Sequence, residues 1–242
     1  MNYIAKFNPY DMSDEIILTV ATGRKKVLHE VLDALEDNLI SDEGQQHLLV
    51  WGPRGIGKSF FLKYLHIQFK KQPIFQNCQF VLLPEEQSNI GFPSDLIHMI
   101  MEQVETGGTE EVIGTWEETP EMWNAAYQRL QDYCAEQKSK HGQFLLVVVI
   151  ENINEFLAKI KNDVIAQSRF RTLLENQKNF CLIGASPHSN VDNDYGNRIF
   201  KIFREVKIKP WTEDDYYNYF SRSWLAHQKT LDQAHSEALR QL

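Results

Sequence analysis

The chain has 242 residues, of which 43% are hydrophobic and 24% are charged, and its formal net charge at pH 7 is -8. This composition is typical of a globular domain and excludes a disordered or fibrous chain. The negative charge argues against a protein that binds nucleic acid or an anionic membrane over its whole surface, although it leaves room for a local basic patch. The three cysteines are widely spaced, and no apolar run has the length of a signal peptide or a membrane span, so we expect a cytoplasmic protein with reduced thiols.

Predicted helices and strands alternate along the chain. The first 44 residues form an N-terminal segment, in which apolar residues recur at helical spacing over residues 25–40. Short apolar runs predict strands at 47–51, 80–83, 144–150, 180–184 and 206–208. Amphipathic or polar stretches predict helices at 58–69, 94–104, 120–137 and 164–176. Strands separated by helices indicate parallel pairing, so we expect an α/β fold built as a three-layer αβα sandwich.

A glycine-rich segment lies between the first predicted strand and the next helix. Residues 52–59 match the pattern G-x-x-x-x-G-K-[ST] in full. Glycines let backbone N–H groups approach a phosphate chain, and the helix that begins near Lys58 directs its free N–H groups at the β-phosphate. Lys58 supplies a cation to the β- and γ-phosphate oxygens, and the hydroxyl of Ser59 is a ligand for magnesium. The residues predicted to bind ATP are Gly52, Pro53, Arg54, Gly55, Ile56, Gly57, Lys58, Ser59 and Phe60.

The apolar run at 144–150 ends in an acidic residue, Glu151. A P-loop requires a carboxylate at the end of a neighbouring buried strand to hold magnesium through water, so we predict that Ser59 and Glu151 form the Mg2+ site. The next residue is Asn152, at a position where many ATPases carry a second acid. An amide can orient the attacking water but cannot accept its proton, and we assign Asn152 that positioning role. Glu155 is either a substitute proton acceptor or a solvated surface acid.

The strand predicted at 180–184 continues into Ala185 and Ser186. A hydroxyl at this strand end would lie between the P-loop and Glu151, where it would sense the γ-phosphate. A turn serine that precedes Pro187 is an equally good interpretation. The sequence leaves both open.

Four segments together resemble the AAA+ ATPases, nearest to the Orc/Cdc6-like initiators and the STAND-like prokaryotic ATPases. They are Thr22-Gly23-Arg24 before a helix, GPRGIGKS at 52–59, VVVIENINEF at 147–156 and CLIGAS at 181–186. The resemblance implies a five-stranded parallel sheet with the P-loop strand in the middle. It also implies an adenine pocket formed partly by residues 22–24.

The same resemblance implies three parts and an arginine that acts in trans. The parts are an N-terminal segment and helix at 1–44, a nucleotide-binding core at 45–210 and a partial helical lid at 211–242. Thr212 and the acids that follow it are typical of the start of a helix in this lid. An arginine in such proteins reaches the neighbouring subunit's site and stabilises developing charge. Arg198 is the first candidate here and Arg204 the second, with an ordinary surface or ion-paired arginine as the alternative for each.

Two departures from the family pattern bear on activity. The usual Asp-Glu pair reads Glu151-Asn152, which favours slow hydrolysis or an ATP-state switch. Few residues follow Trp211, and Arg222 and Arg240 lack a recognisable lid context, so we expect either a longer natural chain or a reduced lid.

These observations predict an ATP-binding module, a weak ATP hydrolase that requires Mg2+ and acts as an oligomerising switch or motor on a macromolecular partner. We expect it to assemble with copies of itself or with a partner protein, and we expect no membrane association. Two alternatives are a DNA-associated initiator or loader, which would reach nucleic acid through the assembly, and an ATP-binding regulatory subunit with little turnover. A small-molecule kinase shares the P-loop pattern, but the long N-terminal segment counts against it.

Overall fold

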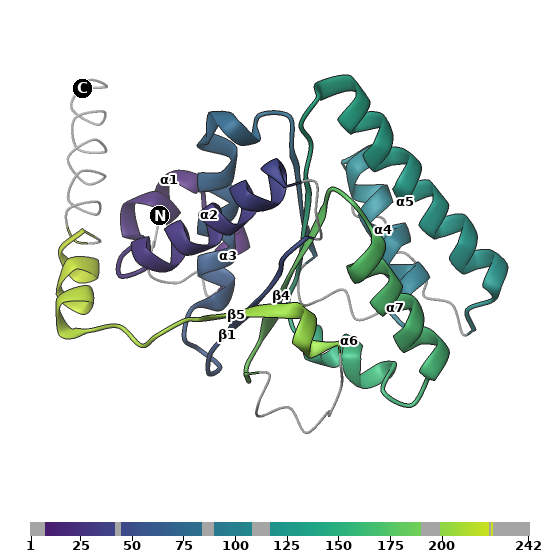
Figure 1. Ribbon diagram of the computed structural model, residues 1–242. Coiled ribbons are helices and arrows are strands. Elements are labelled where there is room, and N and C mark those ends of the chain that lie inside the picture. The colour runs from purple at the N-terminus through teal and green to yellow at the C-terminus, as the bar shows by residue number, and fades with distance from the viewer. Residues whose placement is uncertain are drawn as a thin grey trace, which may run out of the picture.

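A parallel sheet forms the middle layer of the structure (Figure 1). This computed structural model describes residues 8–41, 45–83, 90–107, 117–189, 199–222 and 224. The strands in these ranges are β1 (His47–Trp51), β2 (Gln79–Leu83), β3 (Leu146–Ile150), β4 (Phe180–Ser186) and β5 (Phe203–Lys207). Within these ranges they form one five-stranded sheet in the order β2-β3-β4-β1-β5, and every neighbouring pair is parallel.

This architecture confirms the predicted α/β sandwich but corrects the place of the P-loop strand. The P-loop follows β1, which lies between β4 and β5, and the middle strand of the sheet is β4. Because β1, β4 and β3 are neighbours and run parallel, their carboxyl ends lie along one edge of the sheet. The loop after β1 and the residues after β3 therefore face each other across the end of β4.

Helices cover both faces of the sheet (Figure 1). The α-helices are α1 (Asp14–Val20), α2 (Lys25–Ile40), α3 (Lys58–Lys71), α4 (Pro93–Thr106), α5 (Pro120–His141), α6 (Ile153–Lys159) and α7 (Val164–Asn176), and the short 3-10 helices are η1 (Pro9–Asp11), η2 (Pro73–Phe75) and η3 (Phe200–Ile202). Helices α1–α3 pack in one apolar layer, and α4–α7 pack in the other. Side chains alternate along each strand, so Leu48 and Val50 of β1 join the α1–α3 layer while Leu49 joins the other.

Local sequence explains where several helices begin. The side chains of Ser13, Thr119 and Asp163 accept hydrogen bonds from backbone N–H groups in the first turns of α1, α5 and α7. Asp95 in the first turn of α4 accepts hydrogen bonds from the backbone N–H groups of Gly91 and Phe92, each at 3.0 Å. These caps satisfy donors that the helices themselves leave unpaired.

The predicted boundaries match the structure at both ends in some elements and differ in others. Helices α2 and α7 and strand β1 have the predicted bounds, whereas β5 begins three residues earlier than expected because Phe203 is already buried against the sheet. The short helices α1 and α6 were not predicted. In α1, Ile17 is fully buried with the α2 and α3 side chains, so part of the N-terminal segment belongs to the core.

Residues 213–222 are helical and lie beside the connection between α1 and α2 (Figure 1). Thr212 and Asp215 cap this helix, because the Thr212 hydroxyl accepts from Asp215 N at 3.2 Å and Asp215 accepts from Thr212 N at 2.9 Å. Arg222 donates to the carbonyl oxygen of Ala21 at 3.0 Å. None of the helices in the described ranges combines the length and apolarity that crossing a membrane requires.

Candidate functional site

The loop between β1 and α3 has a backbone conformation that requires glycine at several positions. Gly55 and Gly57 have φ angles of 78° and 92°, in the left-handed region that side chains disfavour. A Cβ atom on Gly52 would lie 3.0 Å from the carbonyl oxygen of Ile208 and 3.1 Å from Cγ2 of Ile56. Three glycines of the predicted phosphate loop are therefore required by conformation or by close packing.

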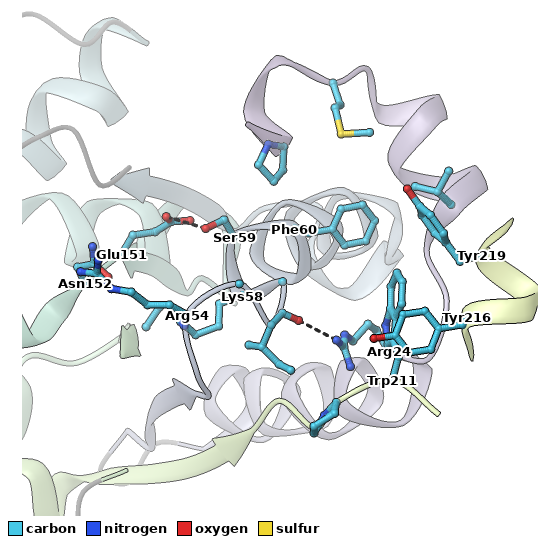
Figure 2. Close-up of a pocket in the computed structure, with 18 residues that line it drawn as sticks. Arg24, Arg54, Lys58, Ser59, Phe60, Glu151, Asn152, Trp211, Tyr216 and Tyr219 are labelled. Atoms are coloured by element: carbon cyan, nitrogen blue, oxygen red, sulfur yellow. Dashed lines mark hydrogen bonds between the residues drawn. The ribbon is translucent and has the colours of Figure 1, made fainter. Parts of the chain in front are cut away.

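This loop borders a cavity of about 750 Å3 that has two chemically different ends (Figure 2). At one end lie the P-loop and the residues that follow β3. At the other end lie aromatic side chains from α3 and from the segment after β5. The polar end is lined by Arg54, Lys58, Ser59, Glu151 and Asn152, and the aromatic end by Phe60, Trp211, Tyr216 and Tyr219. The cavity is also lined by Pro9, Met12, Val20, Gly55, Ile56, Gly57 and Pro210.

At the polar end, the two predicted magnesium residues lie in direct contact. The hydroxyl of Ser59 donates to Oε2 of Glu151 at 3.0 Å (Figure 2). The ammonium group of Lys58 lies over the loop and donates to the carbonyl oxygens of Gly52 at 2.7 Å and Pro53 at 3.2 Å. A hydroxyl beside a carboxylate is the hard oxygen donor set that magnesium prefers, so these residues fit that ion.

Tyr10 contacts this site, although no sequence pattern predicted it. It lies in η1, and its hydroxyl donates to Oε1 of Glu151, the carboxylate oxygen that Ser59 does not bind. Burial, and then the negative charge of Glu151, raises the pKa of Tyr10, so its hydroxyl stays protonated and acts as a donor. The two residues are 141 positions apart, and no spacing pattern connects them.

Asn152 has an unusual backbone conformation that accounts for the residue type. Its φ and ψ angles are 51° and 44°, and it is the N-cap of α6. Asparagine tolerates this left-handed conformation better than glutamate does. Asn152 and Arg54 both line the cavity, and the Arg54 side chain points toward Asn152 (Figure 2). Glu155 is exposed and does not line the cavity, which favours a solvated surface acid.

At the aromatic end, Arg24 joins three segments. Its guanidinium donates to the carbonyl oxygens of Ile56 at 2.9 Å and Lys209 at 2.8 Å, and it lies 5.8 Å from the ring centroid of Trp211. Burial lowers the pKa of Arg24, and the charge of Asp215 acts in the opposite direction. Of residues 22–24, which were predicted to form part of an adenine pocket, Arg24 lines the cavity, and it lies beside Trp211, which was not predicted.

Two other residues proposed from the sequence, Ser186 and Arg204, do not line the cavity. Ser186 is fully buried, its hydroxyl accepts from His188 N at 3.1 Å, and Ala185 is the β4 residue that lines the cavity. Because side chains alternate along a strand, Ser186 faces away when Ala185 faces the cavity, so this geometry favours the turn serine over the γ-phosphate sensor. Arg204 forms a 3.2 Å ion pair with Glu30, as expected for the ordinary alternative. Arg198 and Arg240 lie outside the described residues.

The comparisons with known proteins agree with this fold. The sequence family described as AAA domain matches residues 40–188. Similar solved structures include the Orc1 protein of Aeropyrum pernix in complex with DNA, with 14% identity, a TM-score of 0.60 and coverage of 90% of this chain and 53% of that one. The Orc2 protein of Aeropyrum pernix, solved as ADPNP–ADP complexes, has 12% identity, a TM-score of 0.59 and coverage of 85% and 53%.

Cdc6p from Pyrobaculum aerophilum has 13% identity, a TM-score of 0.55 and coverage of 83% of this chain and 48% of that one. At such identities the structural similarity establishes the fold alone, and this chain spans about half the length of these proteins. A search of curated protein sequences gave no match. The family and structural matches confirm the resemblance to Orc/Cdc6-like AAA+ ATPases that the sequence predicted.

Proposed function

Because this chain belongs to the AAA domain family, we propose that it is a slow ATP-dependent switch that acts on a macromolecular partner. The observation that carries this proposal is the direct contact of Ser59 with Glu151 beside a P-loop whose glycines have the required conformation. This arrangement supports the binding of a nucleoside triphosphate together with a divalent cation. The family supports ATP as the nucleotide.

Different residues of the cavity bind different parts of ATP. Backbone N–H groups of the P-loop and the first turn of α3 hold the phosphates, and Lys58 moves from the loop carbonyls to phosphate oxygens. Ser59 would hold magnesium directly and Glu151 would hold it through water, and the ion would neutralise charge on the phosphates. The aromatic end of the cavity, around Trp211 and Phe60, takes the base by stacking.

Slow hydrolysis follows from the residue after Glu151. Asn152 lines the cavity and can orient a water molecule, but its amide cannot accept a proton. A protein with this site spends long periods in its ATP state, which suits a switch better than a fast motor. The substitution Asn152→Asp keeps a residue that tolerates positive φ and adds a proton acceptor, so we expect it to raise turnover by about tenfold or more.

We propose assembly with further copies of the chain or with a partner protein, since charge in AAA+ sites is completed by an arginine from a neighbouring subunit, for which Arg198 stays the candidate. A DNA-associated initiator or loader is the second candidate. The observation that favours it is the similarity to the Aeropyrum pernix Orc1 fold, which was solved in complex with DNA. The formal charge of -8 counts against direct DNA binding by this chain alone.

The proposal is tested by measuring ATP binding and turnover with Mg2+ over a range of protein concentrations. We expect Lys58→Ala to abolish ATP binding, because it removes the positive charge that binds the phosphates. Lys71→Ala, at the exposed C-terminal end of the same helix, is the matched control and should bind ATP like the wild type. ATP binding that survives Lys58→Ala would refute the P-loop assignment.

The dependence of turnover on protein concentration distinguishes an assembling ATPase from a regulatory subunit. Turnover that rises with protein concentration and disappears in Arg198→Ala indicates a site shared between subunits. Tight ATP binding with turnover that is barely measurable at every concentration indicates a regulatory subunit instead. Rapid turnover by the wild type at low concentration would contradict the role assigned to Asn152.

A further inference from the structure

The carboxylate of Glu151 receives a hydroxyl at each of its two oxygens. Ser59 donates to Oε2 at 3.0 Å, and Tyr10 donates to Oε1. Ser59 comes from the P-loop helix, whereas Tyr10 comes from the first described turn of the chain. One contact therefore lies within the predicted metal site, and the other enters it from the N-terminal segment.

The position of Tyr10 is fixed by its own short turn. The side chain of Asn8 accepts a hydrogen bond from Tyr10 N at 3.0 Å, and the carbonyl oxygen of Asn8 accepts one from Asp11 N at 3.2 Å. Proline at position 9 restricts the backbone in the same turn. This turn packs against α3, the helix that carries Ser59.

A second contact holds the following helix against α3. Lys63 of α3 lies 3.2 Å from Asp14, the first residue of α1. The apolar side of α1 is anchored by Ile17, which is fully buried. The N-terminal segment therefore has a defined place on α3, and Tyr10 reaches Glu151 from that place.

We propose that Tyr10 is a positioning residue of the magnesium site, which orients the carboxylate of Glu151 and makes Mg2+ binding depend on the docked N-terminal segment. This inference rests on the proposed function. By binding Oε1, the tyrosine hydroxyl limits rotation of the carboxylate and leaves Oε2 directed at Ser59. Groups that orient a metal ligand in this way change metal affinity by about 10- to 100-fold when they are removed.

The Tyr10 hydroxyl should affect the binding of Mg2+ more than the binding of the nucleotide. Tyr10 contacts the residue that holds the cation and does not line the cavity, so its hydroxyl should matter to Mg2+ and not to the nucleotide itself. Conversely, bound Mg2+ should hold the N-terminal segment in place, since affinity linked between two groups is reciprocal.

The test is an ATP-binding titration of Tyr10→Phe at a series of Mg2+ concentrations, with a parallel titration in EDTA. We expect the Mg2+ concentration for the half-maximal increase in ATP affinity to rise about tenfold, and ATP affinity in EDTA to stay within about twofold of the wild type. Tyr133→Phe is the matched control, because it removes a hydroxyl from a half-buried tyrosine on the opposite face of the sheet. It should leave both titrations unchanged.

A double substitution isolates the contact. In a Glu151→Ala background, Tyr10→Phe should cause no further change in the Mg2+ requirement, because the carboxylate that it orients is gone. An unchanged Mg2+ requirement in Tyr10→Phe would overturn the inference, and so would an equal loss of ATP affinity with and without Mg2+. A wild-type protein that binds no ATP under either condition would overturn the proposed function as well as this inference.

Discussion

Acidification should destabilise the fold through one buried histidine. His47 begins β1 and is fully buried between the rings of Phe180 and Phe203. Its Nδ1 accepts a hydrogen bond from Leu182 N at 2.9 Å, so the ring proton lies on Nε2, which donates to the carbonyl oxygen of Leu174 at 2.7 Å. A second proton would face the N–H donor of Leu182, and the neutral ring is therefore the form that fits.

The size of the effect follows from the pKa of this group. Burial lowers the pKa of His47 from 6.5 to about 4. Because the folded pKa lies below the unfolded one, the unfolded chain takes up a proton first as the pH falls. The stability is fully present above about pH 6.5, declines between pH 6.5 and 4, and the total loss is about 3 kcal/mol, of which about 2 kcal/mol is lost by pH 5.

The measurement is urea unfolding of the wild type and of His47→Gln at several pH values from about 7.5 to about 4.5, a range that covers most of this loss of stability. Glutamine supplies a neutral donor and acceptor but does not titrate, so the variant should lose less stability on acidification than the wild type does. The exposed His29 gives the matched control, and His29→Gln should keep the wild-type slope. Burial also lowers the pKa of His66, which will leave some acid dependence in both variants. If His47→Gln loses as much stability as the wild type, the assignment of the effect to this ring is wrong.

Three further predictions concern packing, charge and the base. Gly184→Ala should destabilise the fold by about 1–3 kcal/mol in urea unfolding, because its Cβ would lie 2.8 Å from Cγ2 of Ile153, and an unchanged midpoint would contradict this overpacking. Glu118→Ala should cost about 3 kcal/mol in the same assay, since it leaves the half-buried Arg169 guanidinium without its 2.6 Å partner, and a loss below about 1 kcal/mol would show that the pair behaves as a surface one. Trp211→Ala should weaken ATP binding about tenfold and leave binding of inorganic triphosphate unchanged, and equal losses for both ligands would remove the tryptophan from the base end of the cavity.

The phosphate end of the site could be predicted from the sequence because its parts are local. The P-loop is one continuous segment, and Glu151 follows directly on the apolar run that becomes β3. The strand order could not be obtained this way, since the pattern of β1 does not show that it pairs with β4 and β5. The orientation of Ser186 could not be predicted either. Side chains alternate along β4, and because Ala185 lines the cavity, the side chain of Ser186 points away from it.

The remaining parts of the site depend on contacts between distant segments. Tyr10 and Glu151 are 141 positions apart, and Arg24 and the Lys209 carbonyl are 185 positions apart. A tyrosine after Asn-Pro or an arginine before a helix has no periodicity that reveals its partner. Such residues become recognisable only when the N-terminal segment is placed on α3, and this placement is a property of tertiary packing.

The two carbonyl groups that Arg24 binds make it a mechanical link. One belongs to Ile56 at the crest of the P-loop, and the other to Lys209, just before the helix at 213–222. A displacement of Lys209 relative to Ile56 must stretch or break one of these hydrogen bonds. Movement of the segment that leads into the helix at 213–222 is thus coupled to the loop that binds the phosphates, and a nucleotide that stiffens the loop opposes that movement.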